Sequence, residues 1–186
     1  ALYQALEATV RDMLTAQDAL GRFSTYSPEK EFDGWDIWGR KYILLGMQYF
    51  LEICPNEALR TDILAALRRH ADYMIEKLGP ADEGKLEINE ATSHWHGLNS
   101  SSVLEPFVRL YNLTGEQKYL DFAAYIVERG GTSIANIFEM AYEDRLDPYQ
   151  YPVTKAYEMM SCFEGLLEYY RVTGIEKWKD AVVRFA

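Results

Sequence analysis

The sequence has few basic residues and no long apolar run. Its 19 lysines and arginines are outnumbered by 29 aspartates and glutamates, which gives a formal net charge of −10. Nucleic-acid phosphates and anionic membrane surfaces both attract basic patches, so neither is an expected partner of this chain. No apolar run reaches the roughly 18 residues that a transmembrane helix needs, so no membrane-spanning segment is expected either.

Cysteine is also scarce. The 2 cysteines, Cys54 and Cys162, form no Cys-x-x-Cys pair, and each lies in an apolar stretch with helical spacing. Buried free thiols are common in such stretches, so we expect both side chains in the core. These residues predict neither a metal site nor a cofactor in this chain.

The sequence is rich in apolar and aromatic residues. Hydrophobic residues make up 48% and aromatic residues 14% of the 186 positions, which excludes general disorder and is enough for a sizeable core. Both ends read as the middle of a helix, so we expect residues 1–186 to be one all-α region of a larger domain. Because no signal peptide can be read, the compartment is left open, and periplasmic and extracellular locations both fit the sequence.

A repeated segment gives the strongest indication of the fold. The run Tyr111–Asp121 returns as Tyr170–Asp180, with its Thr-Gly pair displaced by 59 residues (174 minus 115). A fainter copy lies one repeat earlier, at Tyr49–Glu57, where Pro-Asn replaces Thr-Gly. Glycine takes the left-handed conformation that ends a helix, and asparagine can replace it. Repetition at a fixed spacing indicates one helical hairpin that is used several times.

Apolar residues recur at helical spacing in most of the chain, and strand-like alternation is weak throughout. The expected helices cover residues 1–17, 36–53, 57–79, 99–113, 117–129, 155–172 and 175–186. Short turns join them into hairpins after a leading helix. We therefore predict an all-α fold, in which helical hairpin repeats stack side by side as part of a toroid.

Longer loops separate the hairpins, at residues 18–35, 80–98 and 130–154. Each loop leads into the first helix of a hairpin, so we expect all of them to gather at one end of the ring and to line a cleft. They place tryptophan, tyrosine and histidine beside carboxylates and amides. Aromatic faces cover the apolar side of a sugar ring, and polar groups bind its hydroxyls. The loops therefore favour a carbohydrate as the ligand.

Several of these residues also have structural interpretations. Asp36 could cap the helix that the first loop leads into, and Asn99 or Ser100 could cap the helix after the second loop. Trp35 and Trp38 could pack in the core of the ring instead of contacting a sugar. The sequence alone leaves both interpretations open.

The chain has 3 histidines. The spacing of His94 and His96 could bind zinc, but no third ligand is evident, so hydrogen bonding or a sugar contact is favoured over a metal site. His70 lies in the middle of a predicted helix, and we expect it to be structural.

Hydrolysis of a glycoside requires two carboxylates, or one carboxylate with another nucleophile. The loop candidates for catalytic residues are Asp33, Asp36 and Glu90, with Glu87, Glu139 and Glu143 as further acids. Their separations cannot be read from the sequence, so no pair is selected. Glu105 and Glu164 occupy equivalent repeat positions, and for Glu105 a structural hydrogen bond is favoured over a substrate contact.

Three motifs carry a resemblance to a known family. The segments Asp33–Gly46, Leu98–Tyr111 and Lys155–Leu167 resemble inner-helix motifs of the β-L-arabinofuranosidase-like glycoside hydrolases, family 127 and its relatives. The resemblance covers about residues 10–186. It implies an (α/α)6 barrel, of which this chain supplies a part, and exo-acting removal of a sugar, often L-arabinofuranose, from plant-type glycans.

The resemblance also implies a mechanism. Characterised members use a cysteine nucleophile bound to zinc with further cysteines and a glutamate, while another glutamate is the general acid/base. Nothing in this chain matches that cluster, and Cys162 is not assigned the nucleophile's role. We expect the cluster after residue 186, so zinc is expected only in a longer protein, and residues 1–186 alone should be inactive.

The chain departs from the family pattern at Tyr42, Ser100 and Lys155, where characterised members have histidines that contact the sugar. These departures leave the L-arabinofuranose specificity open. The residues predicted to bind the substrate are Trp35, Trp38, His94, Trp95, His96, Asn99, Tyr151 and Lys155. Two alternatives remain. The first is another enzyme on the same toroid, either a sugar epimerase or an unsaturated glucuronyl hydrolase, and the hydrolase would need Asp33 or Asp36 as an essential residue. The second is a non-catalytic helical-repeat binding module.

Overall fold

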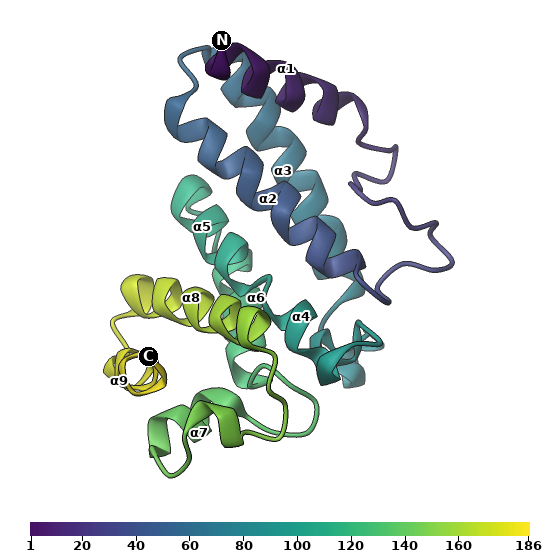
Figure 1. Ribbon diagram of the computed structural model, residues 1–186. Helices are drawn as coiled ribbons and strands as arrows, with labels where there is room; N and C mark the ends of the chain where they lie inside the picture. Colours follow the sequence, from purple (N-terminus) through teal and green to yellow (C-terminus); the bar gives the residue numbers. More distant parts are fainter.

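The computed structural model covers residues 1–186 and consists of α-helices, short 3-10 turns and loops, without strands (Figure 1). The α-helices are α1 (Leu2–Thr15), α2 (Asp36–Ile53), α3 (Glu57–Lys77), α4 (Leu98–Ser101), α5 (Leu104–Thr114), α6 (Gln117–Glu128), α7 (Ile137–Glu143), α8 (Ala156–Thr173) and α9 (Glu176–Phe185). The 3-10 turns are η1 (Ala81–Glu83), η2 (Ile88–Glu90), η3 (Trp95–Gly97) and η4 (Pro148–Gln150). None of the helices is long and apolar enough to cross a membrane.

The hairpin turns have the predicted chemistry. Gly115 and Gly174 end α5 and α8 with φ of +70° and +68°, the left-handed conformation that only glycine adopts without strain. Between α2 and α3 the Asn56 side chain caps the second helix by accepting a hydrogen bond from the Leu59 N–H. These local signals confirm the pairs α2/α3, α5/α6 and α8/α9.

The hairpins stack so that α5 packs between α2 and α8, while α3, α6 and α9 are the second helices of the pairs (Figure 1). One hydrophobic core runs through all of them, from Val10 on α1 to Ala181 on α9. This is the arrangement of an all-α helical-repeat segment of an (α/α)6 barrel, as predicted. We call α2, α5 and α8 the inner helices.

The helix expected at residues 99–113 is broken into α4 and α5. Pro106 has no N–H, so the Ser102 carbonyl lacks the intrahelical donor four residues ahead of it. The Val103 N–H instead donates to the Ser100 carbonyl, as in a 3-10 turn. The prediction of one continuous helix was therefore wrong at this point.

The third predicted loop contains a helix that the sequence analysis missed. α7 begins after Asn136, whose side chain accepts a hydrogen bond from the Glu139 N–H. An asparagine followed three residues later by a glutamate is a typical helix start, so the signal was present. α7 packs against α9 and thereby ties this loop to the last hairpin.

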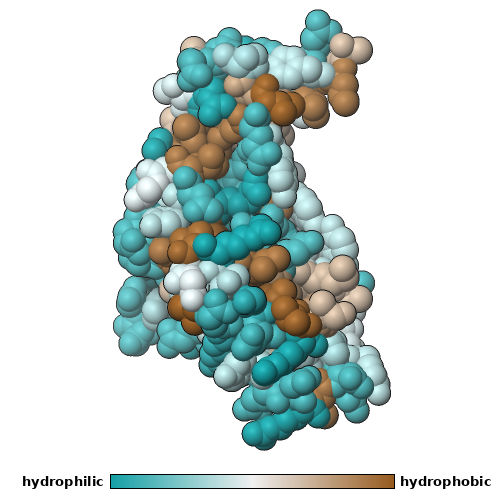
Figure 2. All heavy atoms as spheres, turned by 90° about the vertical axis from the view of Figure 1, so that its left-hand side faces the viewer, coloured by the Kyte–Doolittle hydropathy of each residue, from teal (hydrophilic) through white to brown (hydrophobic).

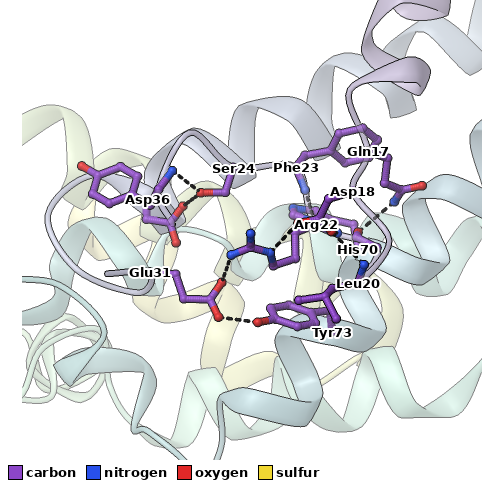
Figure 3. A network of polar contacts seen from close by, with 12 residues as sticks. Gln17, Asp18, Leu20, Arg22, Phe23, Ser24, Glu31, Asp36, His70 and Tyr73 are labelled. Atoms are coloured by element: carbon purple, nitrogen blue, oxygen red, sulfur yellow. Dashed lines mark hydrogen bonds and ion pairs between the residues drawn. The ribbon is translucent and has the colours of Figure 1, made fainter. Parts of the chain in front are cut away.

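A buried network of polar side chains holds the loop at residues 18–35 against α3 (Figure 3). Arg22 donates to Asp18 and to Glu31, and the Tyr73 hydroxyl donates to the same Glu31 carboxylate. Arg40 on α2 donates to Glu31 at 2.7 Å. Burial, followed by the hydrogen bond to Glu31, raises the pKa of Tyr73 to about 12. The network fixes the path of the chain toward Trp35.

Apolar side chains stay open at both ends of the stack. A groove between α1 and α2 contains the exposed Leu6 and Ile53, and a second groove at α8 and α9 contains the exposed Tyr149 and Met160. Figure 2 shows hydrophobic residues gathered in separate patches on one face of the molecule. The end helices therefore have unpaired apolar faces.

Candidate functional site

Hydrogen bonds join the three long loops at one end of the inner helices. The Gly34 carbonyl of the first loop accepts from the Thr92 hydroxyl at 2.8 Å and from the Asn99 amide at 3.2 Å. The Ser133 N–H of the third loop donates to the His96 carbonyl at 2.8 Å. The prediction that these loops gather is confirmed, but the cleft between the inner helices, described below, is lined by residues of those helices and not by the loops.

Aromatic side chains from the first two loops and the inner helices form a series of ring contacts here. Trp35 lies 4.9 Å from His94 and 6.0 Å from Trp38, measured between ring centroids. Trp38 in turn contacts the rings of Tyr42 and Tyr157 at 5.4 and 5.5 Å. Trp95 follows His94 in the sequence, and Lys155 lies two residues before Tyr157. We call the five contacting residues together with Trp95 and Lys155 the aromatic patch.

The aromatic patch has exposed ring faces and unpaired hydrogen-bond donors that could contact a ligand. Trp35 and Trp95 are 41% and 43% exposed, which is high for such large apolar side chains. The Lys155 ammonium lies 5.3 Å from the centre of the Trp95 ring and makes no ion pair, so its donors remain available. An exposed aromatic surface beside unpaired donors matches what a sugar ring requires.

One predicted catalytic residue and two predicted sugar contacts are buried instead. Asp36 accepts hydrogen bonds from Ser24, from the Phe32 N–H and from Arg40. Asn99 is fully buried, and Tyr151 also belongs to the core. These side chains are therefore less exposed than a residue that contacts a ligand is expected to be.

The predicted caps were wrong. Asp36 is the first residue of α2, whose N-cap is Trp35, and no side chain caps that helix. The helix after the second loop starts at Leu98, so neither Asn99 nor Ser100 stands at its N-cap. The Ser100 hydroxyl donates to the carbonyl of Ile88 instead, because burial forces it to find a partner.

The remaining loop candidates are open to solvent. Asp33 accepts a hydrogen bond from the Gly34 N–H, and this bond, followed by one from the Ser93 hydroxyl, lowers the pKa of the carboxyl. Glu90 and His96 are also exposed. The chain contains no group of three or more His, Cys, Asp or Glu side chains that could hold a metal ion.

A cleft of about 360 Å³ lies between the inner helices, and none of the predicted sugar-contacting residues lines it. Its lining residues are Lys41, Tyr42, Leu45, Tyr49, Glu105, Tyr157, Met160, Ser161, Glu164, Leu167 and Glu168. We call it the inner cleft. It borders the aromatic patch, because Tyr42 and Tyr157 belong to both and their hydroxyls lie 2.6 Å apart. The equivalent repeat positions of Glu105 and Glu164 were the one sequence signal for it.

The cysteines do not fit a zinc–thiolate centre. Both are buried, as predicted, and carry free thiols. The Cys162 thiol donates to the Leu98 carbonyl at 3.2 Å, and burial raises its pKa to about 12. A metal ligand or nucleophile needs the thiolate, which this environment disfavours.

The hairpin stack defines a member of the (α/α)6-toroid class, with a patch suited to sugars at one end. A family model for beta-L-arabinofuranosidase, GH127 catalytic domain, matches residues 1–185. The chain belongs to this family and is therefore a glycoside hydrolase of the arabinofuranosidase-like group. A search of the curated proteins found no match to it.

Proposed function

We propose that the chain contributes the sugar-binding end of an exo-acting glycosidase that removes a terminal sugar, such as L-arabinofuranose, from plant-type glycans. The aromatic patch is the observation that carries the proposal. Its exposed Trp35 and Trp95 offer flat apolar faces, and His94 and Lys155 supply hydrogen-bond donors beside them. Substrate then reaches the inner cleft along this patch, because Tyr42 and Tyr157 belong to both.

The test uses the intact protein and a panel of aryl pentosides and hexosides. Trp35→Ala and Trp95→Ala should each lower kcat/KM at least about 5-fold, since an aromatic stacking contact contributes about 1 kcal/mol beyond its buried area. Trp178→Phe is the matched control, because Trp178 lies on α9, outside the patch.

The outcomes are distinct. Hydrolysis of at least one glycoside, with a loss in the two patch variants and none in the control, supports the proposal. Binding without turnover would indicate a helical-repeat binding module instead. Equal activity in all variants would remove the patch from the substrate path. Zinc in a longer protein stays a prediction, which metal analysis of the purified protein checks.

Two observations favour a second candidate, the unsaturated glucuronyl hydrolase. Asp33 is exposed and its pKa is lowered, so it stays charged, and the unpaired Lys155 offers a partner for a uronic acid carboxylate. Asp33→Asn in the intact protein separates the two candidates. Activity on an unsaturated glucuronide that this substitution abolishes would favour the second one, and retained activity would remove Asp33 as a catalyst.

A further inference from the structure

The turn that carries Trp95 has an unusual backbone. Trp95, His96 and Gly97 follow one another with φ of +54°, +50° and +90°. A left-handed conformation brings the Cβ of an L-residue close to the following carbonyl oxygen. Glycine adopts it readily, whereas other residues, and bulky ones above all, adopt it rarely. Two successive non-glycine residues in this region therefore make the turn strained.

The strained residues of the chain gather at the aromatic patch. Four non-glycine residues have a positive φ, and one of them, Asp144, ends α7, where a left-handed residue is ordinary. Phe32 lies three residues before Trp35, and the other two are Trp95 and His96. Three of the four thus belong to the loops that present the exposed tryptophans. Strained backbone is typical of binding sites, where it fixes side chains before a ligand arrives.

Backbone contacts with other segments hold the turn in this conformation. The His96 carbonyl accepts a hydrogen bond from the Ser133 N–H of the third loop at 2.8 Å. Gly97 lies so close to Asn89 that an added Cβ would be 2.2 Å from the Asn89 carbonyl oxygen. The Asn89 amide in turn donates to the Thr132 carbonyl at 3.2 Å. The turn is therefore fixed by its backbone and not by its own side chains.

This arrangement leaves the two side chains of the turn open to a ligand. Trp95 is 43% exposed, and its ring centre lies 5.3 Å from the Lys155 ammonium. The His96 side chain is exposed and makes no hydrogen bond or ion pair within the chain. The direction of the Trp95 indole therefore depends on the backbone conformation of the turn.

We propose that the turn at residues 95–97 is a preorganised element of the sugar-binding site, in which His96 is a positioning residue for Trp95. The inference rests on the proposed glycosidase function, since Trp95 is one of the two exposed stacking surfaces on which that function depends. The left-handed backbone of His96 keeps the indole in one direction, beside Lys155. An indole that is ordered before the sugar arrives loses less conformational entropy on binding.

The first measurement compares the melting temperatures of His96→Gly and His96→Ala. At most positions glycine is less stable than alanine, because it loses more backbone freedom on folding. At a left-handed position the order reverses, so His96→Gly should melt about 2–4 °C above His96→Ala. His94→Gly and His94→Ala are the matched control, since His94 precedes the same turn with an ordinary φ of −120°. There the alanine variant should melt at the higher temperature.

The second measurement gives kcat and KM of the intact protein on the aryl glycoside that it hydrolyses best. Because glycine allows the turn other conformations, His96→Gly should raise KM about 5-fold, which corresponds to a binding-competent fraction of about one fifth. Its kcat should stay within about 2-fold, since the ring binds substrate and transition state alike. Asparagine also takes the left-handed conformation readily, so His96→Asn should keep KM within about 2-fold of the wild-type value.

Each result decides the inference. A glycine variant that melts no higher than the alanine variant at position 96 would show that the turn is not strained. An unchanged KM in His96→Gly would remove the positioning role, and an equal rise in His96→Gly and His96→Asn would assign the imidazole a direct sugar contact instead. Any of these results overturns the inference, while wild-type turnover leaves the glycosidase function standing. If the wild-type protein cleaves no glycoside of the panel, the proposed function fails, and the inference fails with it.

Discussion

At the scale of single residues, buried polar groups set how the protein responds to pH. His70 on α3 is fully buried, and its Nδ1 accepts a hydrogen bond from the Phe23 N–H. Burial, followed by the charge of Arg40, lowers the pKa of His70 to about 3. The unfolded chain binds a proton near the ordinary value of about 6.5, so the contribution of His70 to stability is complete above that pH and is lost as the pH falls toward about 3.

The expected slope is up to about 1.4 kcal/mol of unfolding free energy per pH unit below pH 6. His70→Gln should remove this part of the dependence, which urea denaturation at several pH values between 7 and 5 measures. The exposed His96, replaced in the same way, serves as the control and should leave the slope unchanged. Identical slopes for wild type and His70→Gln would contradict the argument.

At the scale of elements, the turn before α4 requires the backbone of Gly97 to lie close to the backbone of Asn89. Gly97 has φ of +90°, and an added Cβ would lie 2.2 Å from the Asn89 carbonyl oxygen. Gly97→Ala combines left-handed strain with overpacking and should cost about 2–5 kcal/mol of unfolding free energy, measured by chemical denaturation. It should also displace the neighbouring Trp95.

Gly84→Ala is the matched control for this prediction. Gly84 also has a positive φ, +75°, but no atom lies within 4 Å of the added Cβ. The strain alone should cost about 1–2 kcal/mol. Equal losses for the two glycines would show that the contact with Asn89 has no energetic effect.

At the scale of the whole molecule, the open ends of the stack govern association. Leu6 and Ile53 are 41% and 54% exposed in the groove between α1 and α2. Residues 1–186 produced by themselves should bind a hydrophobic dye and self-associate, because contiguous exposed apolar surface favours association. Leu6→Lys combined with Ile53→Lys should reduce both effects, as measured by dye fluorescence and size-exclusion chromatography.

Ile134→Lys provides the comparison, since Ile134 is 53% exposed on the third loop and does not line the groove. This substitution should change neither dye binding nor association. If it reduces them as much as the groove variant does, general solubility and not the groove accounts for the result.

Prediction from the sequence succeeded where the signals were local. The hairpins followed from Gly115 and Gly174, whose conformation depends on the residue itself and not on its neighbours in space. The break at Pro106 and the cap at Asn136 were local signals as well, and they went unused. The meeting of the loops followed from their common place before the inner helices.

The site was predictable only in part. Part of the aromatic patch followed from loop composition, and Trp35 and Trp95 are exposed as a ligand contact requires. Tyr42 and Tyr157 lie on α2 and α8 and were not predicted as part of it. The burial of Asp36 and Asn99 depends on partners from other segments. Ser24 of the first loop donates to Asp36, and the Asn99 amide donates to the Gly34 carbonyl. Periodicity could not show that the polar Lys41 faces a cleft, because a buried lysine breaks the pattern that marks the inner face of a helix.

The sequence by itself determined most of the helices, the hairpin turns and the family, since these depend on residues close together in the chain and on motifs within them. Only the tertiary structure decided which polar side chains are buried and lose their hydration. That outcome depends on contacts between helices whose residues are distant in sequence, and it separates a solvated carboxylate such as Glu164 from a desolvated one such as Glu105.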